Sequence, residues 1–130
     1  MPVVCLDSNL LMGFLRNDPS ATVFLAKLPP SEAKTTIVNA CELYEGAFRA
    51  QNPEKTLPKI EGFLTHFEIL QTEDTAARIF GEIVGALSKR GKRPSDFDAL
   101  IAAIALAHGE ALVTRDAHFK EIRGLKVIRW

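Results

Sequence analysis

Short apolar segments alternate with longer helical segments along this chain, and this alternation restricts the possible folds more than any other feature. The segments 2–6, 35–38, 68–70, 111–114 and 125–130 are short and apolar or rich in β-branched residues, which predicts buried strands. Helical periodicity fills the stretches between them. We therefore expect an α/β protein, with a mainly parallel central sheet of four to five strands in three α/β/α layers.

The helices are bounded by recognisable end signals. They are expected at 8–15, 19–28, 39–51, 53–67, 72–91, 95–108 and 116–122. Asp18 can cap the second of these helices, with Pro19 in its first turn. The helix 95–108 is an almost unbroken run of alanine, leucine and isoleucine, which indicates burial.

Composition and charge are those of an ordinary globular protein. The length of 130 residues predicts a single domain over 1–130. Basic and acidic residues balance at 16 each, so only a local patch could attract nucleic acid. Cys5 and Cys41 lack a CxxC spacing and are expected to be small buried thiols in a reducing compartment. The N-terminal segment lacks the basic region of a signal peptide, and no uncharged run is long enough to span a bilayer. We therefore expect a cytoplasmic protein with no membrane partner.

Carboxylates stand where several of the predicted strands end. Asp7 directly follows the first strand, and Asp116 lies two residues beyond the fourth. Glu42 lies just inside the helix after the second strand, while Asp96 and Asp98 lie in the first turn of the apolar helix. Ligands of parallel sheets collect outside the carboxyl ends of the strands, so four separate segments are expected to bring a carboxylate to one edge.

This cluster has a structural explanation and a chemical one. Each acid alone also suits a helix N-cap or the positive end of a helix dipole. Together, however, carboxylates repel, and one of them takes up a proton unless a cation is bound. Oxygen ligands favour Mg²⁺ or Mn²⁺ over zinc, and such ions can activate water for phosphodiester cleavage. The pattern therefore predicts a divalent-metal site.

Motifs along nearly the whole chain resemble those of the PIN domain family. They are "LDSNLLM", "NACELYEG", "DFDALIAAIALAHGEALVTRDAHF" and "GLKVIRW", in the family's order. Small single-domain members with these motifs are mostly VapC-type toxins of toxin–antitoxin pairs. The resemblance implies a PIN-like nuclease fold and a Mg²⁺- or Mn²⁺-dependent endoribonuclease that hydrolyses RNA phosphodiester bonds. It also implies a cognate antitoxin and a toxin homodimer.

The resemblance assigns roles to individual residues. Those that match the family's catalytic and metal-binding acidic quartet are Asp7, Glu42, Asp98 and Asp116. Asn9 and Thr114 match its polar supporting positions. Relatives often carry asparagine at the fourth acidic position, which implies that Asp116 is a weaker or water-mediated ligand.

The two aspartates of the apolar helix are not equivalent. Residues two apart on a helix point to different sides, so Asp96 and Asp98 cannot bind one ion in the same way. Asp98 shares its face with Ile101 and matches the family's acidic position; its alternative role is a capping box with Ser95. Asp96 is a supporting group, a contact for antitoxin arginines or a plain surface charge.

A dense basic cluster precedes these aspartates, formed by Lys89, Arg90, Lys92 and Arg93. It is either a solvated helix end that complements the helix dipole or a contact to the RNA backbone. Two alternatives to the toxin ribonuclease stay open. One is a PIN nuclease of RNA maturation or one that acts on DNA. The other is a mainly non-catalytic partner of a DNA-binding antitoxin.

Overall fold

The computed structural model describes residues 4–130, so the first two residues of the predicted strand 2–6 lie outside the described residues. Its strands are β1 (Val4–Leu6), β2 (Lys34–Thr36), β3 (Glu68–Leu70), β4 (Ala111–Val113) and β5 (Val127–Ile128). Its α-helices are α1 (Ser8–Leu15), α2 (Pro19–Ala26), α3 (Ile37–Arg49), α4 (Pro53–Leu64), α5 (Asp74–Lys89) and α6 (Asp96–Ala107). Two short 3-10 helices, η1 (Pro30–Glu32) and η2 (Ala117–Glu121), complete it.

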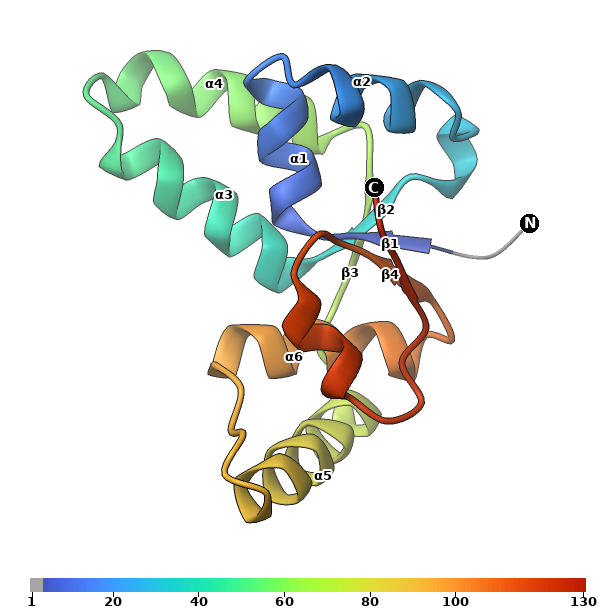
Figure 1. Ribbon diagram of the computed structural model, residues 1–130. Coiled ribbons are helices and arrows are strands. Elements are labelled where there is room, and N and C mark those ends of the chain that lie inside the picture. Colours follow the sequence, from blue (N-terminus) through green and yellow to red (C-terminus); the bar gives the residue numbers. More distant parts are fainter. Residues whose placement is uncertain (1–3) are drawn as a thin grey trace.

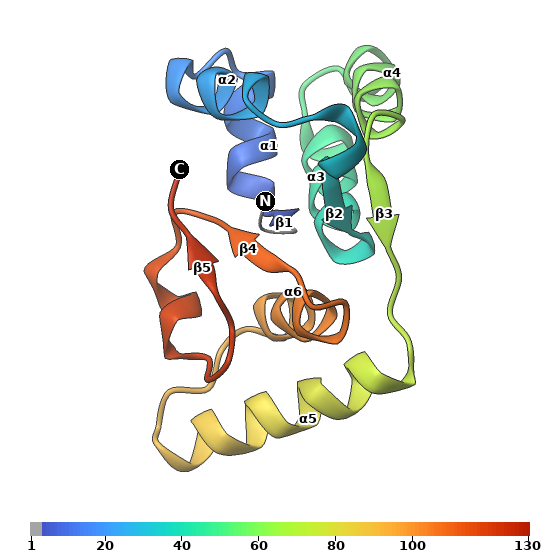
Figure 2. The ribbon, with the colours of Figure 1, turned by 90° about the vertical axis from the view of Figure 1, so that its right-hand side faces the viewer.

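All strand pairs are parallel. One sheet has the order β1-β4-β5, and β2 pairs with β3. The two sets lie side by side where the Thr35 hydroxyl donates to the Leu6 carbonyl oxygen at 2.7 Å. Figure 2 shows the resulting layer in the order β3-β2-β1-β4-β5. The predicted parallel sheet is therefore confirmed.

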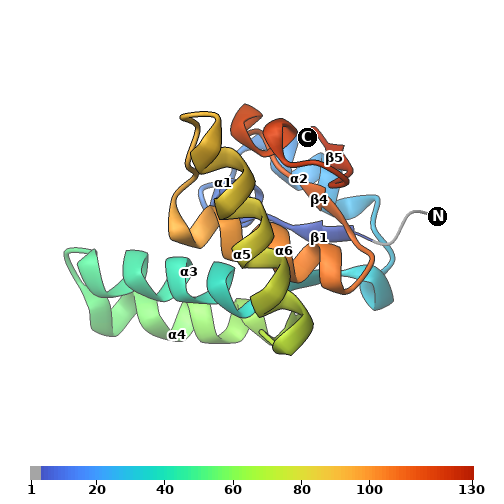
Figure 3. The same cartoon turned by 90° about the horizontal axis from the view of Figure 1, so that it is seen from below.

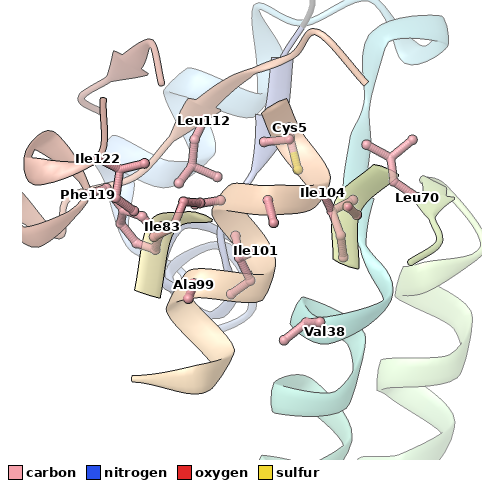
Figure 4. Close-up of a cluster of buried hydrophobic side chains, with 14 of the residues drawn as sticks. Cys5, Val38, Leu70, Ile83, Ala99, Ile101, Ile104, Leu112, Phe119 and Ile122 are labelled. Carbon is pink, nitrogen blue, oxygen red and sulfur yellow. The ribbon is translucent and has the colours of Figure 1, made fainter. Parts of the chain in front are cut away.

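Two hydrophobic cores cover the opposite faces of this layer. Side chains of α1, α2, α3 and α4 form most of one core, and those of α5, α6 and η2 form most of the other. Figure 1 shows α1 to α4 on one side of the strands and α5 with α6 on the other. The helix α6 lies between the sheet and α5, which crosses it in Figure 3. Figure 4 shows Ile101 and Ile104 of α6 among side chains such as Leu112 of β4 and Phe119 of η2. The three-layer α/β/α expectation is confirmed, and burial on all sides explains why α6 is so apolar.

The second predicted strand ends earlier than expected. Its last residues, 37 and 38, belong to α3 because a capping box starts that helix. The Asn39 backbone N–H donates to the Thr36 hydroxyl at 3.1 Å, and the Thr36 backbone N–H donates to the Asn39 side chain at 3.2 Å. Capping by Asp18 with Pro19 in the first turn of α2 is as predicted.

Of the two thiols, Cys5 is buried, but Cys41 is exposed, so its predicted burial is wrong.

No helix within residues 4–130 combines the length and the apolar character that a membrane crossing requires.

Candidate functional site

Asp7 is anchored at the carboxyl ends of β1 and β4. Its backbone N–H donates to the Val113 carbonyl oxygen at 3.0 Å, which continues the strand pairing by one residue. Its side chain caps α1 by accepting from the Ser8 N–H at 2.8 Å. Only 6% of Asp7 is exposed. The backbone therefore fixes the Asp7 carboxylate in a buried position at the carboxyl edge of the sheet.

The Asp7 carboxylate is almost fully engaged. Oδ1 accepts from Ser8 N–H and from the Asn39 side-chain amide at 2.9 Å. Oδ2 accepts from the Thr114 hydroxyl at 2.6 Å. Since each carboxylate oxygen offers about two acceptor positions, Oδ1 is saturated and one position remains on Oδ2.

Glu42 reaches the same edge from the first turns of α3. Its Oε1 accepts from the Ser8 hydroxyl at 2.6 Å and, more weakly, faces the Asn39 amide at 3.5 Å. Burial raises the pKa of the Glu42 carboxyl, and the neighbouring charges of Asp7 and Asp98 raise it further. Glu42 is thus held by two residues that also contact Asp7.

Asp98 and Asp116 approach from α6 and η2. The Asp98 N–H donates to the Ser95 hydroxyl at 3.2 Å, which confirms Ser95 as the N-cap of α6. Burial raises the pKa of Asp98; the charge of Asp116 raises it further, while Ser95 and His118 lower it. Asp116 Oδ1 accepts from the His118 N–H at 2.9 Å and faces its imidazole Nδ1 at 2.8 Å.

These four residues, here called the carboxylate cluster, carry negative charge that is only partly balanced. Burial also raises the pKa of Asp7, against the opposing hydrogen bonds, and Asp98 adds to the rise. Among the described residues, no lysine or arginine forms an ion pair with Asp7, Glu42 or Asp98. Within residues 4–130, however, no three Asp, Glu, His or Cys side chains lie close enough together to form a ready-made metal cage.

The residues fit a hard divalent cation of the Mg²⁺ type in their chemistry. Mg²⁺ keeps several of its waters and needs only one or two protein carboxylates, so a closed cage is not required. Oδ2 of Asp7 has an acceptor position left, and the half-buried carboxyls of Glu42 and Asp98 have no lysine or arginine ion-pair partner among the described residues. A cation would lower the pKa of all three groups.

Asp96 lies apart from the cluster. Its side chain is 65% exposed and accepts from the Arg93 guanidinium at 2.7 Å. The predicted difference between Asp96 and Asp98 is thus visible in the structure, since Asp98 is half-buried and Asp96 faces solvent.

A cleft of about 450 Å³ opens beside Asp98. Its apolar lining includes Phe119, and its polar lining includes Lys92, Arg93 and His118. Lys92 pairs with Glu121 at 3.4 Å, as does Arg90 at 3.5 Å. Part of the predicted basic cluster therefore lines a cleft that leads to the carboxylate cluster.

Sequence reasoning did not single out Ser8 or Asn39. Both are buried and bridge Asp7 to Glu42, with Asn39 also donating to the Ser8 hydroxyl at 2.8 Å. Asn39 sits three residues after a threonine at a strand end, which is a capping-box spacing that could have indicated it. The predicted supporting residues do meet, since the Asn9 amide donates to the Thr114 hydroxyl at 3.0 Å.

Comparison with known proteins agrees with this architecture. The PIN domain family model matches residues 4–125. The chain is 30% identical to the tRNA(fMet)-specific endonuclease VapC of Shigella flexneri, over 96% of each chain. It superposes on DNA-bound VapBC from Salmonella typhimurium with a TM-score of 0.91 and 28% identity, over 100% of this chain and 99% of that one. VapBC-5 of Mycobacterium tuberculosis, from the VapBC family of toxin-antitoxin systems, gives a TM-score of 0.66 and 26% identity over 75% and 81%. The chain therefore belongs to the PIN domain family, and its similarities place it among the VapC-type members.

Proposed function

We propose that this protein is a divalent-metal-dependent endoribonuclease that acts as the toxin of a toxin–antitoxin pair. The observation that carries the proposal is the carboxylate cluster, which four separate segments build at one sheet edge. Among the described residues, no lysine or arginine forms an ion pair with its members Asp7, Glu42 or Asp98. The relatives named as VapC nucleases support the reaction class. The whole chain 1–130 would act as one nuclease domain.

Asp7, Glu42 and Asp98 would hold the metal ion, Mg²⁺ or Mn²⁺. Asp116 would contribute less, because its Oδ1 already accepts from His118. When bound, such an ion supplies the positive charge that acidifies a water and neutralises the phosphodiester during hydrolysis. The protein's part is to fix the ligand oxygens, and Ser8 does so by contacting both Asp7 and Glu42.

The RNA strand would approach along the cleft beside Asp98. Lys92 and Arg93 line this cleft, with Lys89 and Arg90 close by in sequence, and their charges suit a phosphate backbone. In this arrangement Asp96 has a supporting role. Its carboxylate holds the Arg93 guanidinium at 2.7 Å until a phosphate of the RNA takes the place of the carboxylate.

A cognate antitoxin and a second toxin copy are the proposed protein partners. Support for the antitoxin comes from the structural similarity to VapBC complexes, including a member of the toxin-antitoxin VapBC family. The homodimer follows from the family resemblance alone and is a prediction.

Cleavage of defined RNAs with Mg²⁺, Mn²⁺ or EDTA tests this function. We expect Asp7→Asn and Asp98→Asn to abolish cleavage, and the matched variant Asp96→Asn to keep part of it. Full activity in EDTA, or wild-type activity in Asp98→Asn, would contradict the metal site. A parallel set of single-stranded DNA substrates separates an RNA-directed from a DNA-directed nuclease.

A further inference from the structure

Trp130 is joined to Asp7 by an unbroken chain of hydrogen bonds. The indole Nε1–H donates to the Asn9 Oδ1 at 2.9 Å. The Asn9 Nδ2 then donates to the Thr114 hydroxyl at 3.0 Å, and that hydroxyl donates to Asp7 Oδ2 at 2.6 Å. The chain ends on the one Asp7 oxygen that still has an acceptor position.

The indole sets the direction of every bond in this chain. It can only donate, so the Asn9 amide must present its oxygen to Trp130 and its nitrogen to Thr114. The Thr114 hydroxyl also accepts from the Asp116 N–H at 3.0 Å, which fills both of its acceptor positions. Its single proton therefore has to point at Asp7.

The reverse orientation of Asn9 would undo this order. A flipped amide would place its NH₂ against the indole N–H and its oxygen against Thr114. The threonine proton would then have a second acceptor, and Asp7 would compete with Asn9 for it. The indole N–H at position 130 disfavours this alternative, because it requires an acceptor on Asn9.

The indole itself is firmly seated. The Arg115 guanidinium carbon lies 3.6 Å from the ring centroid, and Arg115 Nε donates to the Trp130 backbone oxygen at 2.9 Å. On α1, a Cβ added to Gly13 would lie 3.1 Å from the ring, so a glycine leaves room for it.

We propose that Trp130 is a positioning residue of the metal site, which orients Asn9 and Thr114 so that Asp7 presents Oδ2 in one fixed arrangement. The inference rests on the proposed function, because Asp7 is there a metal ligand. Trp130 touches neither metal nor RNA in this role and acts only through its N–H.

Trp130→Phe removes the N–H and keeps an aromatic ring for Arg115. Loss of a residue that orients a metal ligand directly costs about 10–100-fold in activity or metal affinity. Trp130 acts two hydrogen bonds further away than Thr114, so we expect a loss of about threefold to tenfold in kcat/KM and in Mg²⁺ affinity. The thermal midpoint should stay close to that of the wild type.

A double-mutant cycle separates positioning from packing. Thr114→Val removes the hydroxyl and so breaks the chain of hydrogen bonds. In that background, Trp130→Phe should cause no further loss of kcat/KM or Mg²⁺ affinity. Thr114→Ser keeps the hydroxyl, so the loss should persist there. If the valine variant fails to fold, the Mg²⁺-dependent NMR shifts of the wild type and of Thr114→Ser, described below, decide the proposal. An equal loss from Trp130→Phe in the valine background would overturn the proposal.

A spectroscopic test needs no RNA. Trp130 is the single tryptophan, so its indole N–H gives one assignable NMR signal. Added Mg²⁺ should shift this signal and the Asn9 side-chain amide signals in the wild type and in Thr114→Ser, but not in Thr114→Val. If RNA cleavage fails but these shifts occur, only the ribonuclease function is refuted. If Mg²⁺-dependent cleavage occurs without the shifts, only the role of Trp130 is refuted.

Discussion

Replacement of Asn39 by aspartate exchanges a buried donor for an acceptor and leaves the shape of the side chain unchanged. The Asn39 nitrogen lies 2.9 Å from Asp7 Oδ1, and the residue has no exposed surface. At that 2.9 Å separation and an effective dielectric constant of about 20, two carboxylate charges repel by about 6 kcal/mol. A typical domain is stable by only about 5–15 kcal/mol, so the variant is expected to lose a large part of its stability at neutral pH.

The loss should depend on pH with a definite sign. One of the two facing carboxyls keeps a proton in the folded protein, so its pKa rises above the unfolded value of about 4. The folded state then binds more protons than the unfolded state, and the free energy of unfolding falls as pH increases above about 4. Each unit of pKa rise corresponds to about 1.4 kcal/mol at pH values above both pKa values.

Urea unfolding at several pH values between about 4 and 8 measures this dependence. Asn52→Asp is the matched control, because Asn52 is exposed and its side chain makes no cap hydrogen bond at the start of α4. It should change stability by less than about 1 kcal/mol. An Asn39→Asp protein that loses the same stability at both ends of the range would refute the charge argument and leave only the missing hydrogen bonds as the cause.

Further predictions concern metal, a buried ion pair and RNA. Because burial raises the pKa of three members of the carboxylate cluster, the wild type in EDTA should lose stability as pH rises above about 4. Mg²⁺ at 100 times its Kd should restore about 2.7 kcal/mol at neutral pH, and thermal unfolding without any Mg²⁺ effect would contradict this. The Glu110 side chain is 2% exposed and lies 2.8 Å from the Lys34 ammonium. Lys34→Met leaves this buried carboxylate without its ion-pair partner and should lower the free energy of unfolding in urea by about 3–5 kcal/mol. Replacing Lys92 and Arg93 by glutamine should raise KM for RNA and reduce its logarithmic salt slope by about one for each phosphate that is no longer neutralised, whereas an unchanged slope would place the RNA elsewhere.

Local sequence patterns determined most of the elements and predicted which acids lie at the sheet edge, while the family resemblance predicted the acidic quartet. Period, capping residues and apolar runs act over a few residues, so they indicated α6 and its Ser95 cap, and the α2 cap at Asp18. The rule that parallel strands end at a common edge predicted that Asp7 and Asp116 lie at the same edge of the sheet. Helix geometry likewise separated Asp98 from Asp96.

Tertiary structure decided which side chains hold these acids in place. Asn39 meets Asp7 across 32 positions of sequence, and Trp130 meets Asn9 across 121. No local period encodes such contacts, because they exist only once the sheet has brought distant segments together. The same holds for Cys41, whose apolar neighbours in sequence indicated burial although it lies on the exposed side of α3. Local sequence rules thus predict which acids lie at the sheet edge, whereas packing across the sheet determines the hydrogen bonds that orient them.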